Sequence, residues 1–212
     1  MKIVVADISH IRFAKDICKT IEASATQRGT GIARRTEEYI ITKLENNNAV
    51  VAFEDEKFAG FCYIERWDHG KYIAHSGLIV HPDFRNLGLA KKIKKKIFNY
   101  SLEKYPDAKI FGITTGLAVM KINSDLGYKP VPFSELTDDA HFWAGCNTCT
   151  NYKILKMKEH KMCLCTGMLY VPKKKKNIEL EETQIHEHPY DKKVWTRLKN
   201  IKQALFLKNK KK

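Results

Sequence analysis

The sequence predicts an α/β (α+β) domain in which helices flank a mixed and mostly antiparallel central sheet. Two observations support this fold class. Apolar runs of strand length alternate with stretches whose apolar residues recur at helical spacing, and several strand runs are separated only by short polar turns, as antiparallel neighbours are. With 43% hydrophobic and 29% charged residues among 212, the chain can bury one good core.

The strands are predicted from apolar runs that end at turn residues. Glu-Asp-Glu-Lys between two runs marks a hairpin, and residues 68–71 form a second turn before the central strand. We therefore expect strands at residues 2–6, 49–53 and 58–67, in a central segment that ends at residue 80, and at residues 109–115, 151–157 and 162–171. The last two should be the antiparallel pair that closes the sheet.

The helices are predicted from apolar residues at a spacing of three and four. Asp7 or Ser9 can cap the first helix, and Thr36 opens the second. Helical spacing then predicts helices over residues 11–21, 36–44, 85–102 and 118–126. The predicted element order is β-α-α-β-β-β-α-β-α, followed by more strand.

The positive charge is concentrated near the C-terminus. Of the net charge of +14, residues 172–212 carry +8, because 13 Lys and Arg face 5 Asp and Glu there. We expect a domain at residues 1–171 and a basic linker with a C-terminal amphipathic helix at residues 172–212, packed on the domain or on a second subunit of a homodimer. Nucleic acid is not expected as a partner, since the charge describes this tail rather than the domain.

The N-terminus and the apolar runs bear on localisation. No apolar run approaches the roughly 20 residues that a membrane-spanning helix needs, and the first apolar segment is too short for a signal peptide. The sequence therefore predicts a cytoplasmic protein with no membrane partner.

Residues 74–91 read as a strand, a loop and the start of a long helix. Pro82 cannot extend the ladder of the strand, while Gly88 and Ala90 keep the first helical turn bare. A phosphate could then approach the free backbone N–H groups and the positive end of the helix dipole, with Arg85 and Lys91 adding charge. An ordinary tight turn would also explain a lone Gly-x-Ala.

The motif Arg-x-x-Gly-x-Ala after Leu-Ile-Val-His-Pro resembles the acyl-CoA-binding motif of the GNAT N-acyltransferases, and the resemblance extends over residues 1–171 in element order. It implies that an acyl group moves from acyl-CoA to an amine. It also implies that the strand supplies backbone partners to the pantetheine arm and the helix start binds the pyrophosphate. The implied cofactor-binding residues are Leu78, Val80, Arg85, Asn86, Leu87, Gly88, Leu89, Ala90 and Lys91.

The catalytic groups are less clear from the sequence. In the family a Tyr four residues before a Gly usually protonates the leaving sulfur, and here Asn123 stands in that place before Gly127. For the base, Ser76 shares a strand face with Leu78 and Val80, and His75 alternates to the opposite face. Either is a candidate, although a His in the middle of a sheet is more often a hydrogen-bonded core residue.

Arg34 and Arg35 lie in the glycine-rich loop of residues 27–35, between the first two helices. In the family this loop lines the acceptor site, and planar guanidinium groups bind carboxylates through two hydrogen bonds. We therefore predict that both arginines contact the acceptor. The alternative is two exposed arginines, which the start of the next helix would not favour.

Four of the six cysteines cluster in the sequence. Cys146 and Cys149 are followed by Cys163 and Cys165, and two such pairs on adjacent strands could hold a structural zinc ion. Free thiols in the core are the alternative, and His141 or His160 could also serve as ligands. A disulfide is not expected in a cytoplasmic chain.

Residues 141–152, His-Phe-Trp-Ala-Gly-Cys-Asn-Thr-Cys-Thr-Asn-Tyr, and the domain as a whole look like a GNAT subgroup associated with bacterial arginine synthesis. The resemblance implies an N-acylglutamate synthase role, with acetyl-CoA or succinyl-CoA as the donor and a small acidic amino acid as the acceptor. The alternatives are acylation of a protein or peptide amine, and a GNAT-like binding module without catalysis that uses its basic tail.

Overall fold

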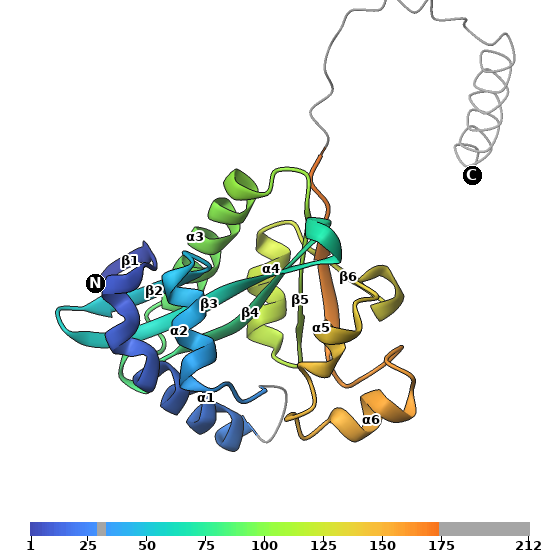
Figure 1. Ribbon diagram of the computed structural model, residues 1–212, viewed down its shortest axis with the longest axis horizontal. Helices are drawn as coiled ribbons and strands as arrows, with labels where there is room; N and C mark the ends of the chain where they lie inside the picture. Colours follow the sequence, from blue (N-terminus) through green and yellow to red (C-terminus); the bar gives the residue numbers. More distant parts are fainter. Residues whose placement is uncertain (29–32, 174–212) are drawn as a thin grey trace, which may run out of the picture. The chain divides into compact units, whose positions relative to one another are not determined.

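The computed structural model describes residues 1–28 and 33–173. Its centre is a seven-stranded sheet in the order β1-β2-β3-β4-β5-β7-β6, in which β4 and β5 pair in parallel and the other neighbours are antiparallel (Figure 1). The strands are β1 (Lys2–Val5), β2 (Ala49–Glu54), β3 (Lys57–Trp67), β4 (Tyr72–Val80), β5 (Lys109–Thr114), β6 (Lys129–Val131) and β7 (Thr166–Tyr170). The predicted mixed sheet is confirmed.

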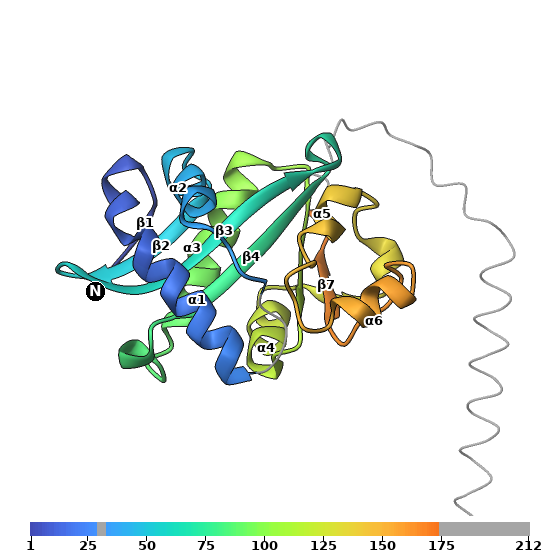
Figure 2. The ribbon, with the colours of Figure 1, turned by 60° about the horizontal axis from the view of Figure 1, so that its bottom comes forward.

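Helices cover both faces of the sheet (Figures 1 and 2). One face packs against α1 and α2, and the other against α3 and α4, so the residues of β2 alternate between two separate apolar clusters. The helices are α1 (Ala14–Arg28), α2 (Glu37–Glu45), α3 (Leu89–Lys104), α4 (Leu117–Asp125), α5 (Ala140–Ala144) and α6 (Tyr152–Met157). The last two pack with β5 and β7 in a third cluster.

Two predicted caps are present in the structure. Asp7 caps the short 3₁₀ helix η1 (Ile8–Phe13) that leads into α1, and its carboxylate accepts from the Ser9 N–H at 2.8 Å. The Thr36 hydroxyl accepts from the Tyr39 N–H at 3.3 Å and begins α2. Each cap satisfies a backbone donor that the helix itself leaves unpaired.

The two parallel strands diverge after three residue pairs. Tyr72, Ile73 and Ala74 of β4 pair with Lys109, Ile110 and Phe111 of β5, and no later pair follows. Beyond that point β5 pairs only with β7, while β4 continues along β3. The facing edges of β4 and β5 are thus open, and a ligand there could use their backbone groups.

A β-bulge at Gly77 corrects the predicted faces of β4. The register with β3 runs from Tyr63↔Ser76 to Phe61↔Ile79, so β4 has one extra residue, and Gly77 takes a φ of +64° that favours glycine. The alternation shifts at the bulge. Leu78 and Val80 therefore pack with the α3 cluster rather than on the face of Ser76, and that part of the prediction was wrong.

The predicted strand at residues 151–157 is also wrong. These residues form α6, which buries Leu155 below 2% exposure, because Tyr152 and Leu155 lie three residues apart and share one helical face. The sheet closes instead with β7, which pairs with β5 on one side and β6 on the other. Short apolar runs do not by themselves distinguish a strand from a buried helix.

Some predictions lie outside the described residues. These are residues 29–32 of the arginine loop and nearly all of the predicted basic linker and C-terminal helix, including Val194, Leu198, Ile201, Leu205 and Phe206. In the part of the chain that the structure describes, no helix is long and apolar enough to cross a bilayer.

Candidate functional site

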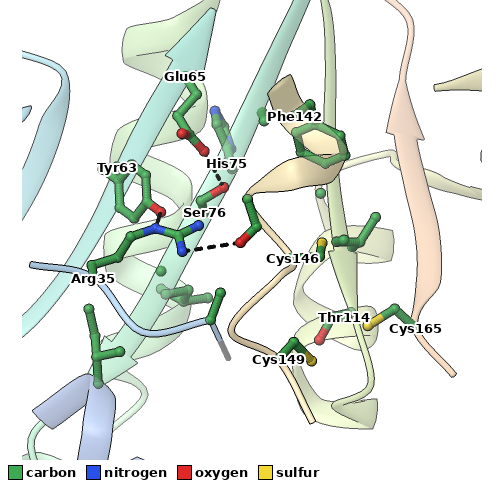
Figure 3. A pocket seen from close by; sticks show the side chains of 18 of the residues that line it. Arg35, Tyr63, Glu65, His75, Ser76, Thr114, Phe142, Cys146, Cys149 and Cys165 are labelled. Carbon is green, nitrogen blue, oxygen red and sulfur yellow. Dashed lines mark hydrogen bonds between the residues drawn. The ribbon is translucent and has the colours of Figure 1, made fainter. Parts of the chain in front are cut away.

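A pocket of about 470 Å³ opens where β4 and β5 diverge. Its walls come from the segment before α2, from β3, β4 and β5, from α3 and α4, and from the segments around α5 and α6 (Figure 3). One side carries Arg35, Tyr63, Glu65 and Ser76, and the side opposite carries thiols (Figure 3). The pocket therefore joins groups that are far apart in the sequence.

Arg35 is fixed by three hydrogen bonds. Its Nε donates to the Tyr63 hydroxyl at 2.9 Å, and Nη1 donates to the carbonyls of Arg34 at 3.0 Å and Gly145 at 3.3 Å. These contacts hold the guanidinium at the pocket wall before any ligand arrives. A planar cation held in this way suits a carboxylate.

Glu65 lies beside Arg35 and accepts two hydroxyl hydrogen bonds. The Ser76 hydroxyl donates to Oε2 at 3.0 Å, and the Tyr39 hydroxyl donates to Oε1. Burial, helped by the neighbouring Glu65 carboxylate, raises the pKa of Tyr63 to about 12, and burial together with Tyr63 and Glu65 also raises the pKa of Tyr39. Both phenols thus stay protonated near neutral pH. The carboxylate can accept a proton or bind an ammonium group.

The structure does not bring the two arginines together. The Arg34 guanidinium is 67% exposed and lies 3.7 Å from Glu22 of α1, while the Arg34 backbone N–H donates to the Thr148 hydroxyl at 3.0 Å. Of the two, only Arg35 has a guanidinium that hydrogen bonds hold at the pocket wall. The predicted pair is therefore one residue in the wall and one at the rim.

His75 and Ser76 point to opposite faces of the sheet, as predicted. His75 is buried, with Nε2 2.9 Å from the Ser101 hydroxyl and Nδ1 3.0 Å from the Tyr128 hydroxyl. Burial and the nearby Lys94 charge hold its pKa well below the usual value, so the ring stays neutral. This is the hydrogen-bonded core histidine that the sequence left as an alternative, whereas Ser76 contacts Glu65 in the pocket.

The predicted phosphate loop has an open start. Gly88 precedes α3 with a φ of +69°, and a side chain added there would meet nothing within 4 Å. Asn86 also has a positive φ of 63°. The Arg85 Nε donates to the Val80 carbonyl at 3.3 Å, and Lys91 Nζ lies 2.8 Å from Asp125. The exposed N–H groups of such a helix start favour an anion.

The four cysteines do gather at the pocket wall, as predicted, but they do not lie on two adjacent strands. Cys146 and Cys149 follow α5, and Cys163 and Cys165 precede β7. Burial and the neighbouring thiols raise the pKa of Cys146 to about 11 and that of Cys165 to about 12. Within residues 1–28 and 33–173, no group of three or more His, Cys, Asp or Glu is arranged to hold a metal ion.

Sequence reasoning missed two groups of the pocket. Glu65 has a recognisable signal, because it lies two residues after Tyr63 on the same face of a strand whose residues 58–64 carry no charge. Lys94 of α3 is 3% exposed although it belongs to a lysine run that was expected to face solvent. Its signal is its position between the buried Ile93 and Ile97.

Residues 18–116 match the family model described as "Acetyltransferase (GNAT) family". No curated protein matches the chain. The matched segment includes α2, the strands β2 to β5 and the predicted phosphate loop, whereas Asn123 and the four cysteines of the pocket lie beyond it.

Solved structures share the fold at low identity. N-acetylglutamate synthase from Neisseria gonorrhoeae, complexed with coenzyme A and N-acetyl-glutamate, is 13% identical with a TM-score of 0.59 over 81% of this chain. The chain covers only 35% of that synthase. Rv2747 from Mycobacterium tuberculosis, in complex with CoA and NLQ, is 12% identical with a TM-score of 0.56, and the match covers 81% of this chain and 99% of that one. The structure of yncA, a putative acetyltransferase from Salmonella typhimurium, with acetyl-CoA is 13% identical with a TM-score of 0.56, and the match covers 82% of this chain and 94% of that one.

The GNAT fold, the open gap between β4 and β5 and the family match therefore agree. Residues 18–116 thus resemble the GNAT acetyltransferases, and the chain has the fold of that family.

Proposed function

We propose that the chain transfers an acyl group from acetyl-CoA or succinyl-CoA to the α-amine of a small acidic amino acid, with glutamate as the first candidate. The observation that carries the proposal is the fixed Arg35 guanidinium next to the Glu65 carboxylate in one pocket. The two groups have the charges that complement an amino acid, a cation for its carboxylate and an anion for its ammonium group.

Glu65 serves as the base in this proposal. An acceptor amine arrives as an ammonium ion and must lose a proton before it attacks the thioester, and Glu65 with Ser76 lies where that proton can be received. Tyr39 and Ser76 both donate to Glu65, so the carboxylate is held in position. The geometry thus supports acid–base chemistry on the Arg35 side of the gap.

An acidic side chain is favoured by the charge of the pocket lining. The described lining residues include two arginines, Arg35 in the wall and Arg34 at the rim, but only one carboxylate, Glu65. This excess suits an acceptor with two carboxylates and one amine. The similarity to the synthase from Neisseria gonorrhoeae, whose complex contains N-acetyl-glutamate, supports the same choice by analogy.

The test compares glutamate, glutamine and a short peptide as acceptors, with release of free thiol as the readout. A hydrogen-bonded charge pair is worth about 1.5 to 3 kcal/mol, so Arg35→Ala should raise the KM for glutamate roughly ten- to a hundred-fold and leave the KM for acyl-CoA nearly unchanged. Arg34→Ala should change either KM at most about fivefold, since exposed pairs contribute little.

Arg12→Ala is the matched control, because Arg12 is a half-exposed arginine paired with Glu56, neither of which lines the pocket. Wild-type protein that ignores free amino acids but acylates the peptide would replace this proposal with acylation of a protein amine. Protein that binds acyl-CoA and acylates neither would favour the binding module.

We propose separately that Cys146, Cys149, Cys163 and Cys165 bind a structural zinc ion. Their common location at the pocket wall supports this, because four cysteines are a usual ligand set for a structural zinc ion.

Elemental analysis should find about one zinc per chain, and a chelator should lower the melting temperature. Cys146→Ser should lose the metal, whereas Cys18→Ser, in α1, should keep it. Metal-free protein that added Zn²⁺ does not stabilise would leave the four residues as thiols of the pocket wall.

A further inference from the structure

Lys94 differs from the lysines around it. Lys91, Lys92, Lys95 and Lys96 are exposed on α3, whereas Lys94 is 3% exposed and lies with the apolar stripe of that helix. Burying an ammonium group without a counter-ion costs stability, so such a residue is rarely retained for packing alone. Its place in the wall of the pocket indicates a function.

Among the described residues, no carboxylate lies close enough to Lys94 to affect its pKa. Its Nζ lies 5.0 Å from the centre of the Tyr128 ring, and Cys62 of β3 and His75 of β4 are its other titratable neighbours. Among the residues that the structure describes, none forms a hydrogen bond or an ion pair with the Lys94 ammonium. The charge is therefore available to a ligand.

Asn123 of α4 provides a second, independent observation. It is 2% exposed, lines the same pocket, and its side-chain Oδ1 has no hydrogen-bond partner within the described part of the chain. A buried acceptor without a donor is costly unless a bound molecule supplies one. Lys94 and Asn123 thus offer one donor and one acceptor to the same bound molecule.

Both residues belong to the helices on the α3 and α4 face, opposite Glu65 and Ser76. On the function proposed above, an acyl-CoA molecule with its phosphates at the start of α3 would reach the pocket along the open edges of β4 and β5. An amine held at Glu65 attacks the thioester carbonyl from the α1 and α2 face. The sulfur then departs toward the opposite face, where Lys94 and Asn123 lie.

We propose that Lys94 donates a proton to the CoA sulfur as the thioester bond breaks, and that Asn123 accepts a hydrogen bond from the thiol that forms. The amine nitrogen forms the new C–N bond, the C–S bond breaks with its electron pair on sulfur, and the Lys94 ammonium supplies the proton. Glu65 takes the proton that the nitrogen loses. The ammonium nitrogen loses two protons in all, one before attack and one as the amide forms, and Glu65 passes both in turn to solvent. Solvent returns one proton to Lys94, so one proton is released in each turnover.

The electrostatics fit this step. Burial lowers the pKa of Lys94 to about 8, against the opposing effect of Cys62, so the ammonium is charged at neutral pH yet more acidic than an exposed lysine. Burial raises the pKa of Cys62 to about 11 and raises that of Tyr128, and burial and Lys94 lower that of His75. These three neighbours are therefore uncharged when Lys94 is protonated.

The first test needs no acceptor, so its failure is distinct from failure of the proposed acceptor. The thiol of CoA is titrated in the complex with the whole protein, and the thiolate is followed by ultraviolet absorbance. Wild-type protein should lower the pKa of the bound thiol by about one unit or more, since a nearby cation favours the anion. Lys94→Met should abolish the shift, and the exposed Lys95→Met should retain it.

The second test is kinetic. Lys94→Met should lower kcat about a hundredfold, the lower range for a lost general acid, and leave the affinity for desulfo-CoA unchanged. Lys94→Arg keeps the charge but not a proton that can be given up, so it should restore the thiol shift and little of kcat. The fall of kcat above pH 8 should disappear in Lys94→Met.

The melting temperature of Lys94→Met should not be lower than that of wild type, because the substitution removes a buried charge. If Lys94→Met does not fold, Lys94→Gln replaces it in both tests. An equal thiol pKa in wild type and Lys94→Met, or an unchanged kcat and pH profile, would overturn the inference.

Discussion

The two sides of the pocket are built in opposite ways. On the α1 and α2 side, Arg35 donates to the Tyr63 hydroxyl and to two backbone carbonyls, and Glu65 accepts from the Tyr39 and Ser76 hydroxyls. On the α3 and α4 side, Lys94 and the Oδ1 of Asn123 are buried without such partners in the described structure. The first side is ready before a ligand binds, while the second is completed by one.

This difference has an energetic meaning. Hydrogen bonds to charged groups contribute about 1.5 to 3 kcal/mol each, so the Arg35 and Glu65 side contributes to stability as well as to binding. Unpaired buried groups cost stability that a ligand can restore. Substitutions on the two sides should therefore separate, with loss of fold and activity on one and loss of activity alone on the other.

The largest effect should come from Glu65→Gln, which removes the proton acceptor but keeps the size of the side chain. A lost general base lowers kcat by about a hundred- to ten-thousand-fold. Glu56→Gln, in the turn between β2 and β3, is the control. Steady-state kinetics with saturating acyl-CoA measures the effect, and a kcat within threefold of wild type would remove Glu65 from the mechanism.

Gly88→Glu should have the next largest effect, on CoA affinity. The space at Gly88 is open, so the new side chain places a negative charge where the phosphates are expected to lie and should raise the Kd for CoA about ten- to a hundred-fold. Gly88→Asn is the matched variant, because Asn tolerates a positive φ and adds no charge. Calorimetry that finds the same affinity in both folded variants would contradict the site.

His75→Gln should affect stability more than catalysis. In the unfolded chain this His takes up a proton near pH 6.5, whereas the depressed pKa keeps it neutral in the folded protein. The contribution of neutral His75 to the free energy of unfolding is therefore present above about pH 6.5. It is lost as the pH falls, by up to about 1.4 kcal/mol per pH unit.

Denaturant unfolding at pH 7 and pH 5 should thus find a smaller pH effect in His75→Gln than in wild type. His141→Gln, at an exposed histidine, is the control. A kcat that falls more than tenfold in His75→Gln would return this residue to the list of catalytic candidates.

The smallest effect is expected from ending the chain at Val171. The predicted phosphate loop, both sides of the pocket and β7 precede this residue. The rate of acyl transfer should therefore stay within about threefold of wild type, because the shortening removes no contact to the transition state. A folded, shortened protein that loses all transfer would show that residues 172–212 complete the site.

Much of the fold follows from local sequence. Apolar periodicity predicted the order of strands and helices as far as α4, and Asp7, Thr36 and Gly88 marked helix starts, because these signals depend on a few neighbouring residues. Residues 151–157 were assigned wrongly because a short apolar run fits either a strand or a helix until its neighbours are known.

The tertiary structure alone decided the site. The bulge at Gly77 set which face Leu78 and Val80 occupy, since one inserted residue reverses the alternation of a strand. The tertiary structure also separated the side chains of Arg34 and Arg35, because Arg34 pairs with Glu22 and Arg35 with Tyr63. Tertiary packing also buried Lys94, one residue of a lysine run, in the pocket that Glu65 lines from the other side. Such roles depend on long-range packing and charge, and local periodicity carries no information about either.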